Sequence, residues 1–103
     1  MEQSHKEWFE TNRDRIPVRQ GQFLGEEKES FYVALSPEEI YELSPLVYYV
    51  WLLCDGKHSI GEIAEKMSSD LDISVEEAID PLVAALHGLE NVNLVVIEKK
   101  TPV

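Results

Sequence analysis

Short apolar runs separated by polar turns fill the first part of the chain, a pattern typical of β-strands. One run with strand character extends from Val18 to Leu24, and the polar segment 25–30 follows it. The run from Phe31 to Leu35 is rich in aromatic and β-branched side chains, which suit a pleated sheet. A third short run, Ile40 to Leu43, comes after the segment Ser36–Glu39. The pattern therefore predicts three strands before residue 44.

The segment that begins at Ser36 fits two structures. Ser36, Pro37 and Glu39 match a helix start, with serine as the N-cap and proline in the first turn. The same residues match a type I turn with proline at its second position. Pro45 disfavours helical backbone at the residue before it, so a helix here would have only about two turns and would be marginal. We therefore favour a turn that leads into the strand Ile40–Leu43.

The second half of the chain contains residues that are typical of the starts and ends of helices. Ser44 caps an apolar helix that runs to Cys54, and Asp55 and Gly56 end it. Two capping boxes follow, in which a serine precedes a glutamate by three residues. Each box opens an apolar stripe with helical spacing. The boxes are Ser59 with Glu62 and Ser74 with Glu77, and the stripes are Ile60, Ile63, Ala64, Met67 and Leu71, then Val75, Ala78, Ile79, Leu82, Val83, Leu86 and Leu89.

The third helix contains Pro81, which either kinks it or, with Asp80 as a cap, restarts it. Asn93 suits the left-handed residue that ends this helix, and Leu94–Ile97 predicts a final strand. The element order predicts an α+β fold: a winged-helix-like domain with an N-terminal three-stranded antiparallel sheet, three helices and a short C-terminal strand. We expect this domain to span residues 17–98. Residues 1–16 are expected to be a flexible or loosely docked extension, and residues 99–103 a tail.

Charge narrows the classes of partner. The 103 residues contain nine Lys and Arg against twenty Asp and Glu, which gives a net charge of −11. Such a surface repels nucleic acids and anionic membranes. The single cysteine allows no internal disulfide, and the apolar run Leu46–Cys54 is far shorter than the ~20 residues of a membrane span. No apolar run follows the first charged residues, so we expect no signal peptide and a cytoplasmic location.

Chemistry-bearing residues are sparse. Cys54 and His58 lie four positions apart, whereas a structural zinc site needs four ligands. We interpret the pair as a buried thiol and a loop histidine. The carboxylates fall at caps and turns, where they complement helix N-termini. We therefore expect no catalytic residues, no metal, no cofactor and no enzymatic activity.

The apolar helix after Ser44 carries more large side chains than one helix face can bury. Tyr48, Tyr49 and Trp51 either pack beneath the N-terminal strands or form an exposed patch. Exposed apolar patches often mark interaction sites. Tyr48 and Trp51 are therefore candidate docking residues for a partner.

The residues from Leu43 to Met67 resemble the PqqD family, which comprises pyrroloquinoline quinone synthesis protein D and the precursor-peptide recognition elements of RiPP pathways. Members have a short strand ending in Leu-Asn, an apolar helix, Leu-Cys-Asp-Gly and then Ser/Thr-x-x-Glu-Ile. The similarity extends over about residues 17–97. The matching positions here are Leu43-Ser44, Leu53-Cys54-Asp55-Gly56 and Ser59-Ile60-Gly61-Glu62-Ile63.

This resemblance implies a domain that binds the leader segment of a ribosomally made precursor peptide. The leader is added as a strand to the edge of the third strand, beside the third helix, and is presented to a modifying enzyme, often a radical SAM protein. Main-chain hydrogen bonds give such strand addition its affinity. The implied peptide-binding residues are Ile40, Tyr41, Glu42 and Leu43 on the strand and Ile79, Leu82, Val83 and Leu86 on the helix.

Two other functions are compatible with such a fold. One is a protein–protein adaptor that no longer binds a leader peptide. The other is winged-helix DNA binding, but the helix 75–91 has four acidic residues and no Lys or Arg to neutralise phosphates. We expect a monomer or a weak homodimer, because an unpaired edge strand can pair with a second copy.

Overall fold

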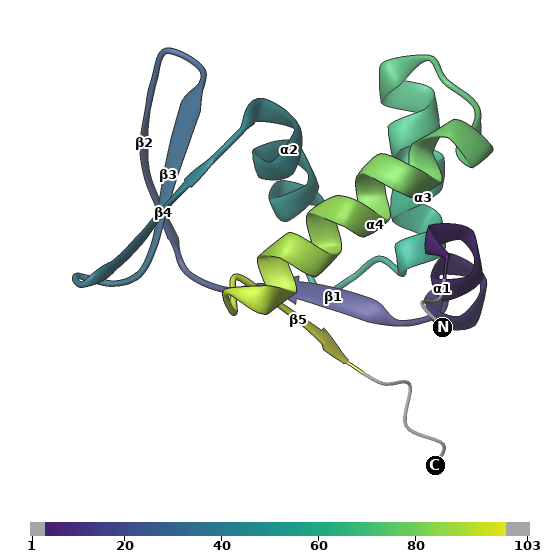
Figure 1. The fold of residues 1–103 in the computed structure, drawn as a ribbon, viewed down its shortest axis with the longest axis horizontal. Coiled ribbons are helices and arrows are strands. Elements are labelled where there is room, and N and C mark those ends of the chain that lie inside the picture. The colour runs from purple at the N-terminus through teal and green to yellow at the C-terminus, as the bar shows by residue number, and fades with distance from the viewer. Residues whose placement is uncertain (1–3, 99–103) are drawn as a thin grey trace.

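The computed structural model describes residues 4–98, which form a mixed α+β fold with antiparallel sheets and four helices (Figure 1). The α2 helix lies between a three-stranded sheet on one side and the other helices on the other. In chain order the elements are α1 (His5–Asn12), β1 (Ile16–Arg19), β2 (Gln22–Glu27), β3 (Ser30–Ser36), β4 (Glu39–Leu43), α2 (Pro45–Leu53), α3 (Ile60–Leu71), α4 (Val75–Asn91) and β5 (Val95–Glu98).

The three-stranded antiparallel sheet has the order β2-β3-β4, and β1 pairs separately with β5. The turn at Ser36 and the strand after it agree with the prediction, because β4 covers Glu39–Leu43. The expected single strand Val18–Leu24 is wrong. It is two strands, β1 and β2, which belong to different sheets.

Gly21 explains why that strand divides. Its φ is +93°, a conformation that side-chain-bearing residues rarely adopt. A Cβ at this position would lie 2.8 Å from the carbonyl oxygen of Ala34. Just before the glycine, the amide of Gln20 donates to the carbonyl of Leu94 at 2.8 Å. The chain therefore leaves the β1–β5 pair and enters β2 within two residues.

The N-terminal extension also differs from the expectation of a loosely docked segment. Its residues 5–12 form α1, which Ser4 caps and which packs against α3 and α4. Phe9 is 2% exposed in the core, and Trp8 packs edge-to-face on the His87 ring at 4.8 Å between centroids. Phe9 in the core and Trp8 on the His87 ring together dock this helix.

The expected helices correspond to α2, α3 and α4. Ser44, Ser59 and Ser74 are their N-caps, and both predicted capping boxes are present. The α4 helix continues through Pro81 to Asn91 without a restart. Asn93 has the expected left-handed backbone, with φ at 65°.

Trp51 of α2 joins the strands to the helices. Its side chain is 3% exposed, and its indole Nε1 donates to the carbonyl oxygens of Gln20 and Leu94, each at 3.1 Å. The Arg19 guanidinium lies over the indole, 5.7 Å from the ring centroid. One side chain therefore holds α2 against the β1–β2 junction and the start of β5.

Within residues 4–98, none of the helices has the length and apolar character that crossing a bilayer requires.

We predict that Phe9→Ala lowers the free energy of unfolding by about 3–5 kcal/mol, because it leaves a cavity beneath α1. Urea denaturation followed by circular dichroism measures this change. Glu10→Ala is the matched control, since Glu10 is exposed on the same helix and should alter stability by no more than about 0.5 kcal/mol. Equal stabilities for the two variants would mean that α1 contributes nothing to the fold.

Candidate functional site

The β4 strand forms one edge of the three-stranded sheet, and among the described strands only β3 pairs with it. Its residues alternate in exposure. Ile40 is 52% exposed and Glu42 is exposed, whereas Tyr41 is half-buried and Leu43 is 7% exposed. Along an antiparallel strand, alternate residues direct both backbone polar groups away from the neighbour. The four strand residues implied by the family resemblance therefore lie on an edge that can accept another strand.

The four helix residues implied by the resemblance do not line that edge. Ile79, Leu82, Val83 and Leu86 are all buried, with 0–4% of their surface exposed. The α4 helix packs chiefly against α3, α1 and α2. These elements cover its apolar stripe, so the four side chains are core and have no surface left for a peptide. That part of the expected site is corrected.

The exposed side of α4 includes, beside its acidic residues and His87, a few small side chains that the sequence interpretation passed over. Pro81 is half-buried, and Ala84 and Gly88 are exposed. A Cβ added at Gly88 would meet no atom within 4 Å. The signal was present in the sequence as small residues at helical spacing beside the apolar stripe.

The two candidate docking residues of α2 take part in packing. Trp51 is buried, as described above, so it offers no docking surface. Tyr48 is half-buried and stacks on the Phe31 ring at 4.3 Å between centroids, with Phe23 at 5.1 Å. Of the two interpretations, the structure supports packing beneath the strands.

Cys54 and His58 lie in different surroundings, one buried and the other exposed. Cys54 is fully buried, its thiol donates to the carbonyl of Val50 at 3.2 Å, and burial raises its pKa to about 12. His58 is exposed and contacts the Asp55 carboxylate at 3.0 Å. The amide of Lys57 donates to that carboxylate and, with His58, lowers the pKa of Asp55. Asp55 therefore orders the turn between α2 and α3.

Within residues 4–98, no three His, Cys, Asp or Glu side chains come together as a set that could hold a metal ion. The nearest pair, His58 and Asp55, lacks a third ligand among these residues.

The comparison of the sequence with protein-family models shows the family to which the chain belongs. The model of the family described as coenzyme PQQ synthesis protein D, PqqD, matches residues 32–95, which extend from β3 to the first residue of β5. The chain belongs to the PqqD family. The matched PqqD region contains β4, the three following helices and the Cys54–Gly56 turn. No curated protein and no solved structure gives a significant match.

We predict that Cys54 of this PqqD-family protein is structural. Cys54→Ala should cost about 1–2 kcal/mol of stability through a small cavity. In the native protein the thiol should react with iodoacetamide at pH 8 far more slowly than in urea, because burial keeps it protonated. Mass spectrometry of alkylated protein measures both rates. Equal rates, or stoichiometric zinc that the variant loses, would contradict a structural role.

Proposed function

We propose that this protein binds the leader segment of a ribosomally made precursor peptide and presents it to a modifying enzyme of the radical SAM class. The observation that carries the proposal is the open edge of β4 within the region matched by the PqqD family. The leader would pair with Glu39–Leu43 as a fourth strand of the sheet. The protein's role would be recognition, without a catalytic step of its own.

The chemistry of strand addition suits β4. The outward backbone groups of the edge would bond the leader, each hydrogen bond contributing a net stabilisation of about 0.5–1.5 kcal/mol. Such bonds are independent of sequence, so the side chains next to the edge would choose the peptide. Ile40 offers an exposed apolar contact and Glu42 an exposed carboxylate. A leader with an apolar and a basic residue two positions apart would match both, because residues two apart on a strand share a face of the sheet.

The buried residues of α4 have a supporting role in this proposal. Ile79, Leu82, Val83 and Leu86 would hold the helix in place through the core, and a bound leader would meet the exposed small side chains of α4 instead. We further propose that α2–α4 with β1 and β5 make up the winged-helix-like unit. Residues 17–98 would form the recognition domain, onto which α1 packs, and the protein would work in the cytoplasm.

The carboxylates at the start of α4 are paired with basic side chains, whereas the ion pairs of the described residues include none of those beside β4. Glu76 is paired with Lys6 at 2.7 Å, and Asp80 lies 3.2 Å from His5. By contrast, Glu38 and Glu39 lie at the β3–β4 turn, and Glu42 accepts a hydrogen bond from the Ser30 hydroxyl. Attraction of a basic leader would therefore centre on the strand side of the site.

We predict that proline in β4 abolishes leader binding by removing a backbone donor. Tyr41→Pro and Glu42→Pro should each weaken binding at least tenfold while most helicity remains. The probes are fluorescently labelled peptides translated from short reading frames beside the gene, and fluorescence anisotropy measures affinity.

Glu42→Ala is the matched control for this experiment. It removes the same side chain but keeps the backbone N–H, so it should bind the leader much more tightly than Glu42→Pro. Neighbouring residues of a strand direct their N–H groups to opposite sides. One proline therefore blocks the open edge and the other disturbs the β3–β4 ladder, and only the second should lower the melting temperature strongly. Wild-type affinity in both proline variants would refute strand addition.

We also predict that leader association slows as salt rises. The Debye length is about 8 Å at physiological ionic strength, so exposed carboxylates attract a basic partner mainly at low salt. Stopped-flow kinetics should give a falling association rate and a nearly constant dissociation rate, and DNA should not bind. An association rate that does not depend on salt would mean that these carboxylates do not steer the peptide.

A further inference from the structure

The β2–β4 sheet has a second face that α2 does not cover. Cross-strand partners share a face of a sheet. Phe31 pairs with Leu43 and Val33 with Tyr41, and these face α2. On the other face, which we call the outer face, Ala34 pairs with Gln22 and Ile40, and Tyr32 pairs with Gly25 and Glu42.

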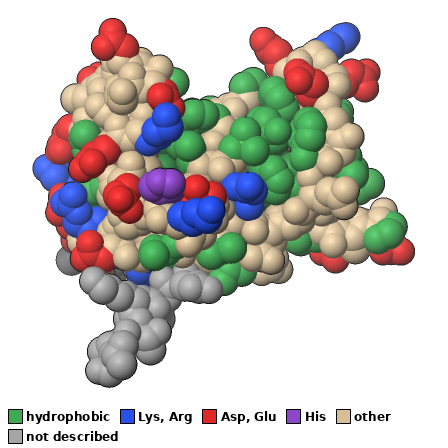
Figure 2. All heavy atoms as spheres, turned by 180° about the vertical axis from the view of Figure 1, so that it is seen from behind, with side chains coloured by type: hydrophobic (Ala, Val, Ile, Leu, Met, Phe, Trp, Pro, Cys, Tyr) green, Lys and Arg blue, Asp and Glu red, His purple; other side chains and the backbone are tan. Residues whose placement is uncertain are grey.

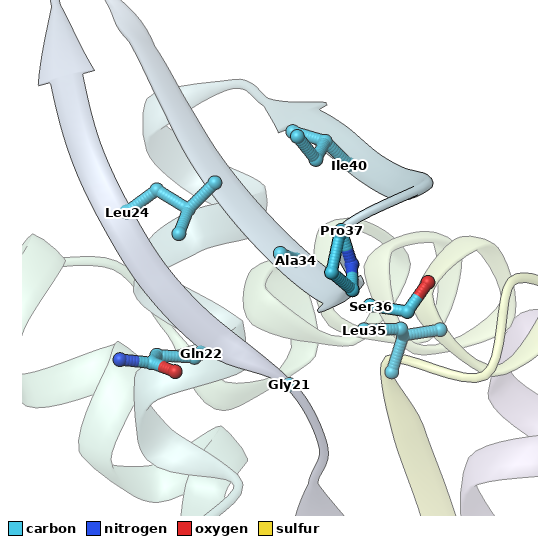
Figure 3. A pocket seen from close by; sticks show the side chains of 8 residues that line it. All are labelled: Gly21, Gln22, Leu24, Ala34, Leu35, Ser36, Pro37 and Ile40. Carbon is cyan, nitrogen blue, oxygen red and sulfur yellow. The ribbon is translucent and has the colours of Figure 1, made fainter.

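The outer face contains an open groove of about 610 Å³. Leu24 and Ile40 lie on opposite sides of it with Ala34 between them (Figure 3). Leu24 and Ile40 are each 52% exposed, the highest values among the exposed large apolar residues of the described chain. A small residue between two large ones makes a trough that a single bulky side chain can enter.

Acidic residues lie beyond this groove, toward both ends of the sheet. Residues 22–43 contain six glutamates and one lysine. Figure 2 shows acidic side chains gathered at the tip of the β2–β3 hairpin and again at the β3–β4 turn, the two ends of the sheet. Glu27 pairs with Ser30 and Glu42 with Tyr32, so both carboxylates share the outer face with the groove. The residues that line the groove are uncharged, and the carboxylates lie beyond them along the same face and at the two ends of the sheet.

We propose that the outer face docks a basic amphipathic helix of the modifying enzyme. One large apolar side chain of that helix would enter the trough over Ala34, and flanking Lys or Arg side chains would reach Glu27 and Glu42. The identity of the partner rests on the proposed function, whereas the surface and its chemistry rest on the groove and its charges. The leader would then pair with the edge of β4, and the enzyme would bind the outer face of the same sheet.

Charge favours this occupant over the others. A second copy would bring the same glutamates against themselves, and like charges facing each other are unfavourable. Nucleic acids and anionic membranes are repelled for the same reason. A helix with one large apolar side chain between basic ones would contact the apolar groove and the carboxylates beyond it at the same time, as in other helix-in-groove complexes.

The test uses a synthetic amphipathic peptide of Leu and Lys with about four helical turns, roughly 14 residues. A peptide with Glu in place of each Lys is the charge control. Calorimetry measures affinity, and changes in amide chemical shifts locate the binding surface. We expect the Leu/Lys peptide to shift the amides of Leu24, Ala34 and Ile40, and the Leu/Glu peptide to leave them unchanged.

Leu24→Ser should weaken binding of the Leu/Lys peptide at least tenfold. Leu71→Ser is its matched control, because Leu71 is 44% exposed at the end of α3 and lies outside the groove; it should leave the affinity unchanged. Shifts confined to other surfaces, equal losses in the two variants, or equal binding of both peptides would overturn the proposal.

The outcome is separable from that of the proposed function. Leu24→Ser keeps the backbone of β4 intact, so it should leave leader binding at the wild-type level. Tyr41→Pro should weaken leader binding at least tenfold while the Leu/Lys peptide still shifts the amides of Leu24 and Ala34, because Tyr41 pairs with Val33 on the other face of the sheet and Glu42 is retained. If the Leu/Lys peptide fails to bind the wild type and the leader binds, only the outer-face proposal falls. If the leader fails and the Leu/Lys peptide binds the groove, only strand addition falls.

Discussion

The indole of Trp51 is the constraint on which the arrangement of this protein depends. Its single N–H is shared between the carbonyls of Gln20 and Leu94, which lie far apart in sequence. A buried indole donor without a partner would be costly, so these carbonyls must remain beside α2. That requirement sets where β1 gives way to β2 and where α4 gives way to β5. The two sheets are positioned through one side chain.

The same helix determines which surfaces stay open. The α2 helix covers one face of the β2–β4 sheet, where Tyr48 stacks on Phe31 and lies against Phe23. Aromatic pairs of this kind contribute about 0.5–1.5 kcal/mol beyond the area they bury. With most of that face covered, the two edges of the sheet, at β2 and at β4, and the outer face are the parts left open among the described residues. Under the proposed function, packing against α2 would use one face of these strands, and the partners would use the β4 edge and the other face.

Local signals made the helices predictable. The serine caps, the Ser74–Glu77 and Ser59–Glu62 boxes and the left-handed Asn93 all act within a few residues, so the sequence alone places them. The β4 strand was also predictable, because Pro45 limits any helix before it. The family motif, with Cys54 at its centre, was equally local, and the family match agrees with it.

What could not be predicted depends on contacts between distant residues. The β1–β5 pairing joins segments separated by most of the chain, and only the approach of Gly21 to Ala34 reveals the break between β1 and β2. Likewise, the helix stripe at Ile79 and Leu86 has the same pattern whether it faces a ligand or the core. The docking of Phe9, together with α3 and α2, makes it core.

The open edge of β4 also bears on how the protein behaves alone. An edge that accepts a peptide strand accepts equally well the same strand of another copy, and such pairing is the usual start of edge-to-edge aggregation. Near neutral pH the glutamates beside β4 keep two copies apart by repulsion. If β4 binds a leader, the residues that disfavour the pairing of two copies are the same ones that border the binding edge.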